Sequence, residues 1–351
     1  MPSAPLTPDA LVIGGGPAGL MAAEMLLAAG RSVLLADQRP SLARKLLMAG
    51  KSGLNLTKDE DVETCLQAYG GAAGRLGPMI RAFPPEAVRS WAEGLGQPLF
   101  TGSSGRVFPE AMKASPLVRA WLGRLGAAGL AVRTRWRWTG WTDDAATFET
   151  PEGPVRVAAR TTILALGGAS WARLGSDWRW TGALAEIGAP LVPFAPANAG
   201  LKIPWSDHMA PHLGRPLKNV VFRSGGIESR GEAVLSAGGL EGGGLYPLSP
   251  ALRTGAPLAI DLCPDVAADT LAARLAARPS RESASNRVRK AARLGPVARA
   301  LVAEVARPCP RSRARWRRCS RRCRSPMTAS DRSTRRSRPR GALPSRGSTK
   351  T

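Results

Sequence analysis

The segment from Ala10 to Asp37 constrains the fold of this chain more than any other part of the sequence. It begins with ALVI at residues 10–13, an apolar run of the length expected for a buried strand. A glycine-rich turn leads into Ala-, Leu- and Met-rich sequence that suits a helix, and Gly30 ends this helix. A second apolar run, VLLA at residues 33–36, ends at Asp37. The order strand, glycine turn, helix, strand, acid predicts the start of a Rossmann-like α/β domain.

The glycine turn has the spacing of a dinucleotide-binding loop. Gly14 allows a tight turn, Gly16 lets the backbone approach a pyrophosphate, and Gly19 lets the helix pack close to the strand. The helix N-terminus presents N–H groups and a positive dipole end to phosphates. Asp37 follows at the distance expected of an acceptor for ribose hydroxyls. A glycine turn of some other α/β protein is the structural alternative. The predicted ligand contacts are Gly14, Gly15, Gly16, Pro17, Ala18, Gly19, Asp37 and Gln38.

A single motif of this kind leaves two cofactors open. An enzyme that uses NAD as its sole cofactor would need no second motif. The stretch after the second strand, RKLLMAGKSGLNLT at residues 44–57, favours FAD. It places basic and small residues beside the predicted pyrophosphate site. A basic loop exposed to solvent is the alternative, and we predict that the loop folds over the cofactor.

From this loop onward the sequence resembles the aminoacetone-oxidase-like bacterial flavoproteins, also described as BaiN/YhiN-type NAD(P)/FAD-dependent oxidoreductases. Their glycine motif is followed by an Arg-Lys-Leu-Leu…Gly-Gly…Asn-Leu-Thr loop that contacts FAD. Arg44, Lys45, Asn55 and Thr57 match this loop, whereas Ser52 stands where a glycine is usual. The resemblance implies FAD contacts from Arg44, Lys45 and Asn55.

Further motifs extend the resemblance to about residues 9–306. SGRVFP at 104–109 and KASP at 113–116 match the family, and TTILALGGAS at 161–170 is more specific. This last stretch predicts a buried strand that ends in a glycine pair, and the resemblance implies that the chain passes close to the flavin here. An ordinary core strand and turn is the alternative. The contacts implied here are Ala165, Leu166, Gly167 and Gly168.

The alternating stretch AVRTRWRWTGW, Ala131 to Trp141, predicts one strand. Arg beside aromatic residues can indicate stacking with nucleic-acid bases. We favour instead a strand whose aromatic face packs inside the protein. In the resembling flavoproteins a strand here passes the adenine, which implies that Trp138 lies near it.

The composition of the sequence changes at Phe194. Prolines and glycine turns become frequent there, and they indicate short strands. GGLEGGGLY at 238–246 matches a motif of the inserted domain that covers the reactive face of the flavin in the resembling family. We therefore expect a two-dinucleotide-binding-type, Rossmann-like FAD domain over residues 1–193. An inserted β-rich domain with a helical segment, 267–306, would follow over 194–306, and a tail over 307–351.

Catalytic side chains are not evident from any motif, which fits a flavoenzyme whose cofactor carries the redox chemistry. His208 and His212 have Pro211 between them, which disfavours a regular helix, and we expect surface or loop histidines. The cysteine spacing indicates neither a zinc site nor a disulfide framework, so we predict no metal. The N-terminal segment lacks the features of a signal peptide or membrane span. We expect a cytoplasmic protein with a small-molecule substrate and no membrane partner. NAD(P)H is a candidate electron donor. The sequence does not indicate the oligomeric state.

The net charge of +24 is concentrated in the tail. Residues 307–351 hold 16 Lys and Arg and one acid, Asp331, so the tail carries +15 and residues 1–306 carry +9. The tail contains no Ile, Val or Phe and a single Leu, Leu343, so it cannot bury enough apolar surface to fold. It is either a disordered basic arm that binds phosphates or the product of a reading-frame shift in a GC-rich gene.

We favour the frameshift interpretation of the tail. RSRPRGA at 336–342 has an allowed codon set that, read two bases later, encodes Ile-Ser-Thr-Ala-Gly-Gly. The resembling family has this stretch in its closing segment. Three functions stay open: an FAD-dependent oxidoreductase, which we favour; a nucleic-acid-associated flavoprotein with a basic arm; and an inactive product of a frameshifted gene. Nucleic-acid binding through the tail would be non-specific at most.

Overall fold

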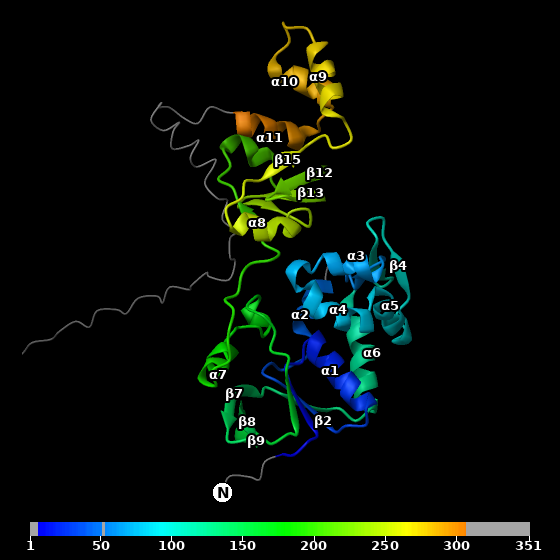
Figure 1. Cartoon of the computed structure of the whole chain (residues 1–351), viewed down its shortest axis with the longest axis vertical. Coiled ribbons are helices and arrows are strands. Elements are labelled where there is room, and N and C mark those ends of the chain that lie inside the picture. Colours follow the sequence, from blue (N-terminus) through cyan, green and yellow to red (C-terminus); the bar gives the residue numbers. More distant parts are fainter. Residues whose placement is uncertain (1–5, 51–52, 307–351) are drawn as a thin grey trace, which may run out of the picture. The chain divides into compact units, whose positions relative to one another are not determined.

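The computed structural model describes residues 6–50 and 53–306 of a chain that divides into two compact units. Unit 1 is Met1–Phe194 and unit 2 is Ala195–Thr351 (Figure 1). The predictions made for Ser52 and for the tail, 307–351, fall outside the described residues.

Unit 1 is built on a four-stranded parallel sheet with the order β10-β1-β2-β6. Its strands are β1 (Ala10–Ile13), β2 (Val33–Asp37), β6 (Ala131–Thr134) and β10 (Thr161–Leu164). The predicted strand–turn–helix–strand unit is confirmed, because α1 (Pro17–Ala28) connects β1 to β2 and Asp37 ends β2. Gly30, with a φ of 70°, follows the end of α1.

One face of this sheet packs on helices. Val12 and Leu35 of the sheet join a core with α1, α5 (Pro85–Gly94) and α6 (Ala114–Ala127), and Figure 1 shows α1 and α6 side by side. Glu24 of α1 accepts hydrogen bonds from the indole of Trp121 (2.6 Å) and from Arg124 (3.0 Å), which ties α1 to α6. The remaining elements of this part are α2 (Arg44–Ala49), α3 (Val62–Gln67), a 3-10 helix (Gly70–Ala72), α4 (Ala73–Ala82) and an antiparallel sheet of β3 (Thr57–Lys58), β5 (Arg106–Pro109) and β4 (Leu99–Thr101).

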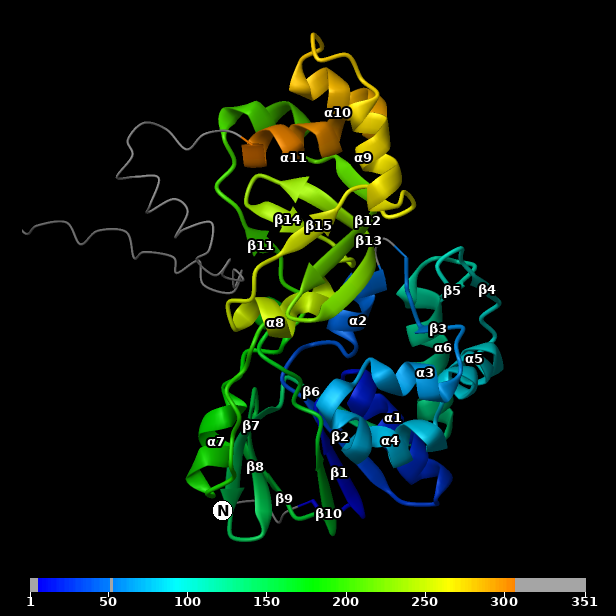
Figure 2. The ribbon, with the colours of Figure 1, turned by 45° about the horizontal axis from the view of Figure 1, so that its top comes forward.

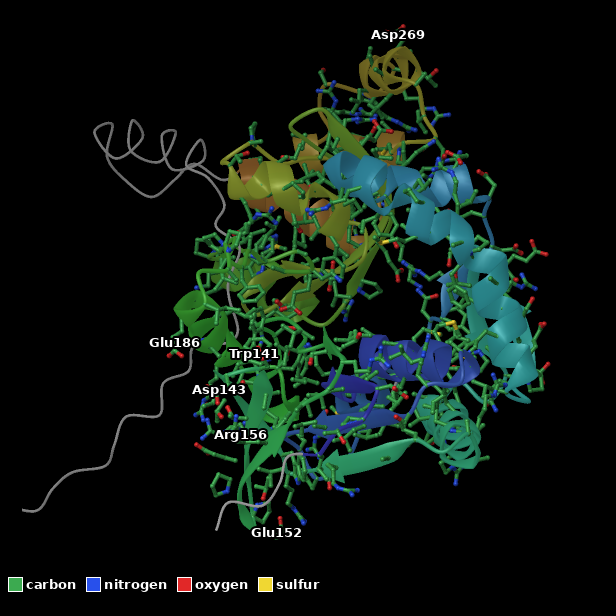
Figure 3. All side chains as sticks on the ribbon, turned by 60° about the horizontal axis from the view of Figure 1, so that its bottom comes forward. Trp141, Asp143, Glu152, Arg156, Glu186 and Asp269 are labelled. Atoms are coloured by element: carbon green, nitrogen blue, oxygen red, sulfur yellow. The ribbon has the colours of Figure 1, made fainter. Side chains whose placement is uncertain are left out.

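The other face of the parallel sheet packs on a three-stranded antiparallel sheet. Because side chains alternate along a strand, Leu11 and Ile13 face this second layer, where they meet Trp136, Trp138 and Phe148. Its strands are β7 (Arg137–Thr142), β8 (Ala145–Thr150) and β9 (Gly153–Val157); a 3-10 helix (Ala172–Leu174) and α7 (Trp180–Glu186) come later in unit 1. Figure 3 shows Asp143 and Arg156, an ion pair at 2.9 Å, at the opposite end of this sheet from Glu152.

Two predictions for these strands are wrong. The stretch 131–141 is not one strand: Arg135 has a φ of 58°, and the turn there separates β6 from β7, which belong to different sheets. The aromatic face does pack inside, as expected. The strand β10 forms but is only partly buried, because among the described residues it pairs on one side only, with β1, and Leu164 stays 38% exposed.

Unit 2 contains a five-stranded antiparallel sheet with the order β11-β14-β13-β12-β15 and the helices expected over 267–306 (Figure 2). Phe222 of β12 and Leu235 of β13 are at the centre of its core, to which Leu301 of α11 belongs. The histidines predicted outside a regular helix, His208 and His212, lie in a short 3-10 helix. The elements are β11 (Leu201–Lys202), β12 (Pro216–Ser224), β13 (Ile227–Ser236), β14 (Gly239–Glu241), β15 (Ala259–Asp261), α8 (Ser249–Arg253), α9 (Ala268–Ala276), α10 (Ala284–Ala292), α11 (Pro296–Ala306) and the 3-10 helices Asp207–His212 and Tyr246–Leu248.

Candidate functional site

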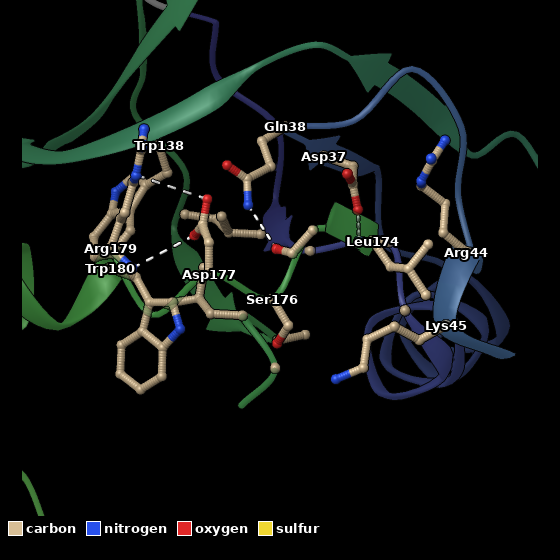
Figure 4. Close-up of a pocket in the computed structure, with 18 of the residues that line it drawn as sticks. Asp37, Gln38, Arg44, Lys45, Trp138, Leu174, Ser176, Asp177, Arg179 and Trp180 are labelled. Atoms are coloured by element: carbon tan, nitrogen blue, oxygen red, sulfur yellow. Dashed lines mark hydrogen bonds and ion pairs between the residues drawn. The ribbon is translucent and has the colours of Figure 1, made fainter. Parts of the chain in front are cut away.

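A cavity of about 1250 Å³ lies in unit 1 at the carboxyl ends of β1, β2 and β10 (Figure 4). Open parallel sheets bind ligands at this edge. The volume exceeds the roughly 300–1,000 Å³ of ordinary small-ligand pockets, so the cavity can hold a large ligand. Thirteen of the sixteen residues predicted to bind a cofactor line it: Gly14, Gly15, Gly16, Pro17, Ala18, Asp37, Gln38, Arg44, Lys45, Trp138, Ala165, Leu166 and Gly167.

The other three predicted residues do not line the cavity. Gly19 is buried beneath the turn. Asn55 is exposed and lies beyond the cavity wall. Gly168 directs its carbonyl oxygen to the hydroxyl of Ser176, from which it accepts a hydrogen bond.

Two glycines of the turn are required by the protein's own packing. Gly14 has a φ of 111°, and a Cβ there would lie 2.3 Å from the carbonyl oxygen of Ala165. A Cβ on Gly19 would lie 1.9 Å from the carbonyl oxygen of Gly14. Both distances are far inside van der Waals contact, so these glycines hold β1, β10 and α1 close together.

Gly16 is different, because beyond its two chain neighbours no described atom lies within 4 Å of the position that its Cβ would take. Its φ of −82° and ψ of −179° are open to any residue. Gly16 is the N-cap of α1, where no side chain caps the helix and the first turn contains no acid. The free N–H groups and the helix dipole therefore face an open space that favours an anion, and a side chain at Gly16 would fill this space.

Asp37 presents a carboxylate of fixed orientation. Its Oδ2 accepts a hydrogen bond from the Gly15 N–H at 2.7 Å, and its Oδ1 accepts one from the Arg39 N–H at 2.7 Å. Each carboxylate oxygen can accept a further bond, for example from a ribose hydroxyl. The neighbouring Gln38 uses its amide nitrogen differently, since it donates to the carbonyl oxygen of Gly175 at 2.6 Å.

The two basic residues after β2 lie on a short helix, α2, where a loop was expected. Figure 4 shows their side chains diverging from this helix. The Lys45 amino group donates to the Ser170 hydroxyl at 3.2 Å, and burial lowers its pKa below the ordinary value. Arg44 donates to the Ser41 hydroxyl at 3.2 Å. Both cations are thus at the cavity wall, where a phosphate would compensate their charge.

The aromatic end of the cavity contains two indole N–H groups that need an acceptor. Trp138 packs edge-to-face on Trp141 and is 8% exposed; Trp180 packs in the same manner on Phe194. Neither Nε1 has a hydrogen-bond partner among the described residues. Buried indole donors usually find a partner, so a polar ligand in this wall would satisfy them.

The stretch Trp171–Glu186 was missed by the sequence interpretation. It contributes Leu174, Gly175, Ser176, Asp177, Arg179 and Trp180 to the cavity wall (Figure 4). The available signal was the run SWARLGSDWRWTG directly after the glycine pair, in which three tryptophans fall within ten residues. Its place beside Asp37 depends on contacts between residues more than 130 positions apart, which no local pattern encodes.

Within the described ranges, no group of three or more His, Cys, Asp or Glu side chains could hold a metal ion. Over the same residues, no helix combines the length and hydrophobicity needed to cross a membrane.

Comparison with known proteins identifies relatives of this chain. Residues 8–258 match the HI0933-like protein Rossmann domain. The 3-dehydro-bile acid delta(4,6)-reductase of Clostridium scindens (strain ATCC 35704 / DSM 5676 / VPI 13733 / 19) is 25% identical over 253 residues, which are 70% of this chain and 60% of that protein. The chain thus spans about three fifths of this relative's length.

Two solved structures are among those similar to this chain. One is the open conformation of a flavocytochrome c3 fumarate reductase, with a TM-score of 0.45 and 19% identity over 62% of this chain and 48% of that one. The other is the 3-ketosteroid-delta4-(5alpha)-dehydrogenase of Rhodococcus jostii RHA1, with a TM-score of 0.35 and 15% identity over 46% of each chain.

Proposed function

The chain belongs to the HI0933-like family of FAD-binding Rossmann proteins, and we propose that it is an oxidoreductase that holds FAD in the cavity of unit 1. The observation that carries the proposal is the open space at Gly16. Packing explains Gly14 and Gly19, whereas Gly16 lines the cavity at the N-terminus of α1 and its Cβ would meet no packed neighbour, so packing does not require a glycine there.

The residues at the cavity wall fit the parts of a dinucleotide. The pyrophosphate would lie at Gly16, on the N–H groups of the first turn of α1. The Asp37 carboxylate would accept hydrogen bonds from the adenosine ribose. Lys45 would offset part of the negative charge. Trp138 of β7 lines the same cavity as Asp37 and would contact the adenine.

The flavin, when bound, supplies two-electron transfer between a donor and an acceptor. We propose NAD(P)H, or a small amine or carbonyl compound, as the reaction partner. The clostridial relative is a reductase, which supports transfer of electrons to an organic substrate. The protein's own part is to bind and orient the cofactor and to limit access of water.

The test is to purify the full chain, denature it, and identify the released chromophore by chromatography. We expect FAD. Gly16→Val should remove it, because the side chain occupies the space of the pyrophosphate while the backbone conformation stays allowed.

Gly123→Val is the matched control. Gly123 lies in the middle of α6, and its Cβ also would meet nothing within 4 Å, but it does not line the cavity. This variant should keep its FAD. A folded protein that binds NADH tightly and contains no flavin would replace the proposal with a plain dehydrogenase.

A further inference from the structure

Residues 168–176, which we call the strap, begin after β10 and extend to the side chains that follow β2. The Gln38 amide donates to the carbonyl oxygen of Gly175 at 2.6 Å, and the Arg39 guanidinium donates to that of Ala172 at 2.7 Å. In the sheet, β1 lies between β10 and β2. The strap therefore crosses the carboxyl end of β1, where the glycine turn begins, and it lines the same cavity.

Two glycines, one directly before the strap and one near its end, are required by its conformation. Gly167 has a φ of 74°, and a Cβ there would lie 2.7 Å from the hydroxyl oxygen of Ser176. Gly175 has a φ of 113°, and its Cβ would lie 3.0 Å from Cγ of Arg39. The Ser176 hydroxyl, on a residue that is 3% exposed, closes the strap by donating to the carbonyl oxygen of Gly168.

The Gln38 and Arg39 side chains form hydrogen bonds with the strap. In the described chain both donate to strap carbonyl oxygens, while the backbone N–H of Arg39 holds Asp37. The two residues thus connect the segment that covers the cavity to the carboxylate that would bind the ribose. A segment held by a few side-chain hydrogen bonds can open without unfolding the sheet beneath it.

We propose that Gln38 and Arg39 are positioning residues that hold the strap across a bound dinucleotide and so set the rate at which the dinucleotide leaves. The inference rests on the proposed function, since it assumes a dinucleotide at Gly16. Opening of the strap would precede release, and these two hydrogen bonds, together with the bond from Lys45 to Ser170, would limit how often it opens.

The experiment measures release rates of FAD and of ADP from the full chain by stopped-flow fluorescence and competition. Gln38→Met and Arg39→Met remove the donors and keep similar side-chain length. In the double variant both ligands should leave at least about thirtyfold faster, the effect of losing two hydrogen bonds, one of them from a charged donor. Arg39→Lys keeps a charged donor and should give an intermediate rate.

Arg133→Met is the matched control, because Arg133 also donates to a backbone carbonyl but does not line the cavity. Its release rates should equal those of the unchanged chain. The thermal midpoint without nucleotide should fall only slightly in the double variant relative to this control, because the strap can open without unfolding the sheet. Faster release at a nearly unchanged midpoint separates positioning from a general structural role.

Gly175→Ala displaces the strap without removing either donor and should also speed release. If Gly175→Ala leaves the rates unchanged while the double variant raises them, the two residues contact the nucleotide directly and the inference is wrong. Equal rates in all variants would also overturn it. Binding of ADP without FAD would refute the proposed function and still test the strap with ADP; binding of neither would refute both.

Discussion

Two glycine-rich stretches of this chain look alike in sequence and differ in what surrounds them. In unit 1, the turn at 14–19 leaves an open space at Gly16 beside a large cavity. In unit 2, the stretch 238–244 is packed against its own neighbours. A Cβ on Gly239 would lie 1.8 Å from the carbonyl oxygen of Leu201, and one on Gly244 would lie 2.6 Å from the Phe222 ring.

The difference shows that glycine content does not identify a ligand site. Gly239, with a φ of 139°, is needed so that β11 and β14 can approach each other. Gly16 has an ordinary backbone conformation and no packed neighbour, and it lines the cavity at the N-terminus of a helix. A binding glycine is therefore recognised by an open Cβ position together with a place at a cavity wall and a helix N-terminus.

The largest effect on stability is expected for Gly239→Ala. The methyl group would overlap the backbone of Leu201 at a φ that alanine rarely adopts, and unit 2 should lose about 3–4 kcal/mol. Hydrogen exchange followed by mass spectrometry should show loss of protection over β11, β13 and β14. FAD bound to unit 1 should be retained, and its loss would contradict the contrast between the two stretches.

Gly14→Ala should be less severe, at about 2–3 kcal/mol, because its Cβ would lie 2.3 Å from the carbonyl oxygen of Ala165, a less deep overlap than the 1.8 Å at Gly239. Both stability and FAD content should fall together in this variant. In Gly16→Val, by comparison, FAD content should fall while the ligand-free protein loses at most about 1 kcal/mol, the cost of a poorer N-cap on α1. A loss as large as that of Gly14→Ala would mean that Gly16 is also a packing glycine.

A smaller effect is expected for the variant Lys45→Met, in the way that stability depends on pH. Lys45 lines the same cavity as the glycine turn. Burial lowers the pKa of its amino group below 10.5, so the folded protein binds fewer protons than the unfolded chain just below that pH. Stability should therefore rise as the pH increases toward 10.5 in the ligand-free protein. Lys45→Met should reduce this rise in the thermal midpoint. The exposed Lys58, changed to Met, serves as the control and should leave the rise in place.

The smallest effect is expected for Gly238→Ala. Gly238 is the open glycine of the unit 2 stretch, and its Cβ would have its nearest neighbour at 3.9 Å. Stability should change by less than about 0.5 kcal/mol, and FAD content should not change. A marked loss of FAD here would show that the unit 2 stretch takes part in cofactor binding after all.

Much of unit 1 could be predicted because its signals are local. The β1–α1–β2 segment and Asp37 follow from apolar spacing and glycine positions within thirty residues. Other expectations failed for non-local reasons. The alternation of 131–141 continues through Arg135, but β6 pairs with β2 while β7 pairs with β8, and one strand cannot serve both sheets. The apolar residues of β10 predicted burial, but burial depends on how many strands flank it.

By itself, the sequence determined that this chain forms a Rossmann-type turn with Gly14, Gly16 and Gly19, because a backbone turn of this kind depends on residues adjacent in the chain. Only the tertiary structure decided which glycine faces empty space, and which distant residues complete the wall. Gln38 and Gly175 are 137 positions apart, and their hydrogen bond exists because three strands place both at one edge of a sheet. Local conformation is written in neighbouring residues, whereas a cavity is the space that packing of distant segments leaves unfilled.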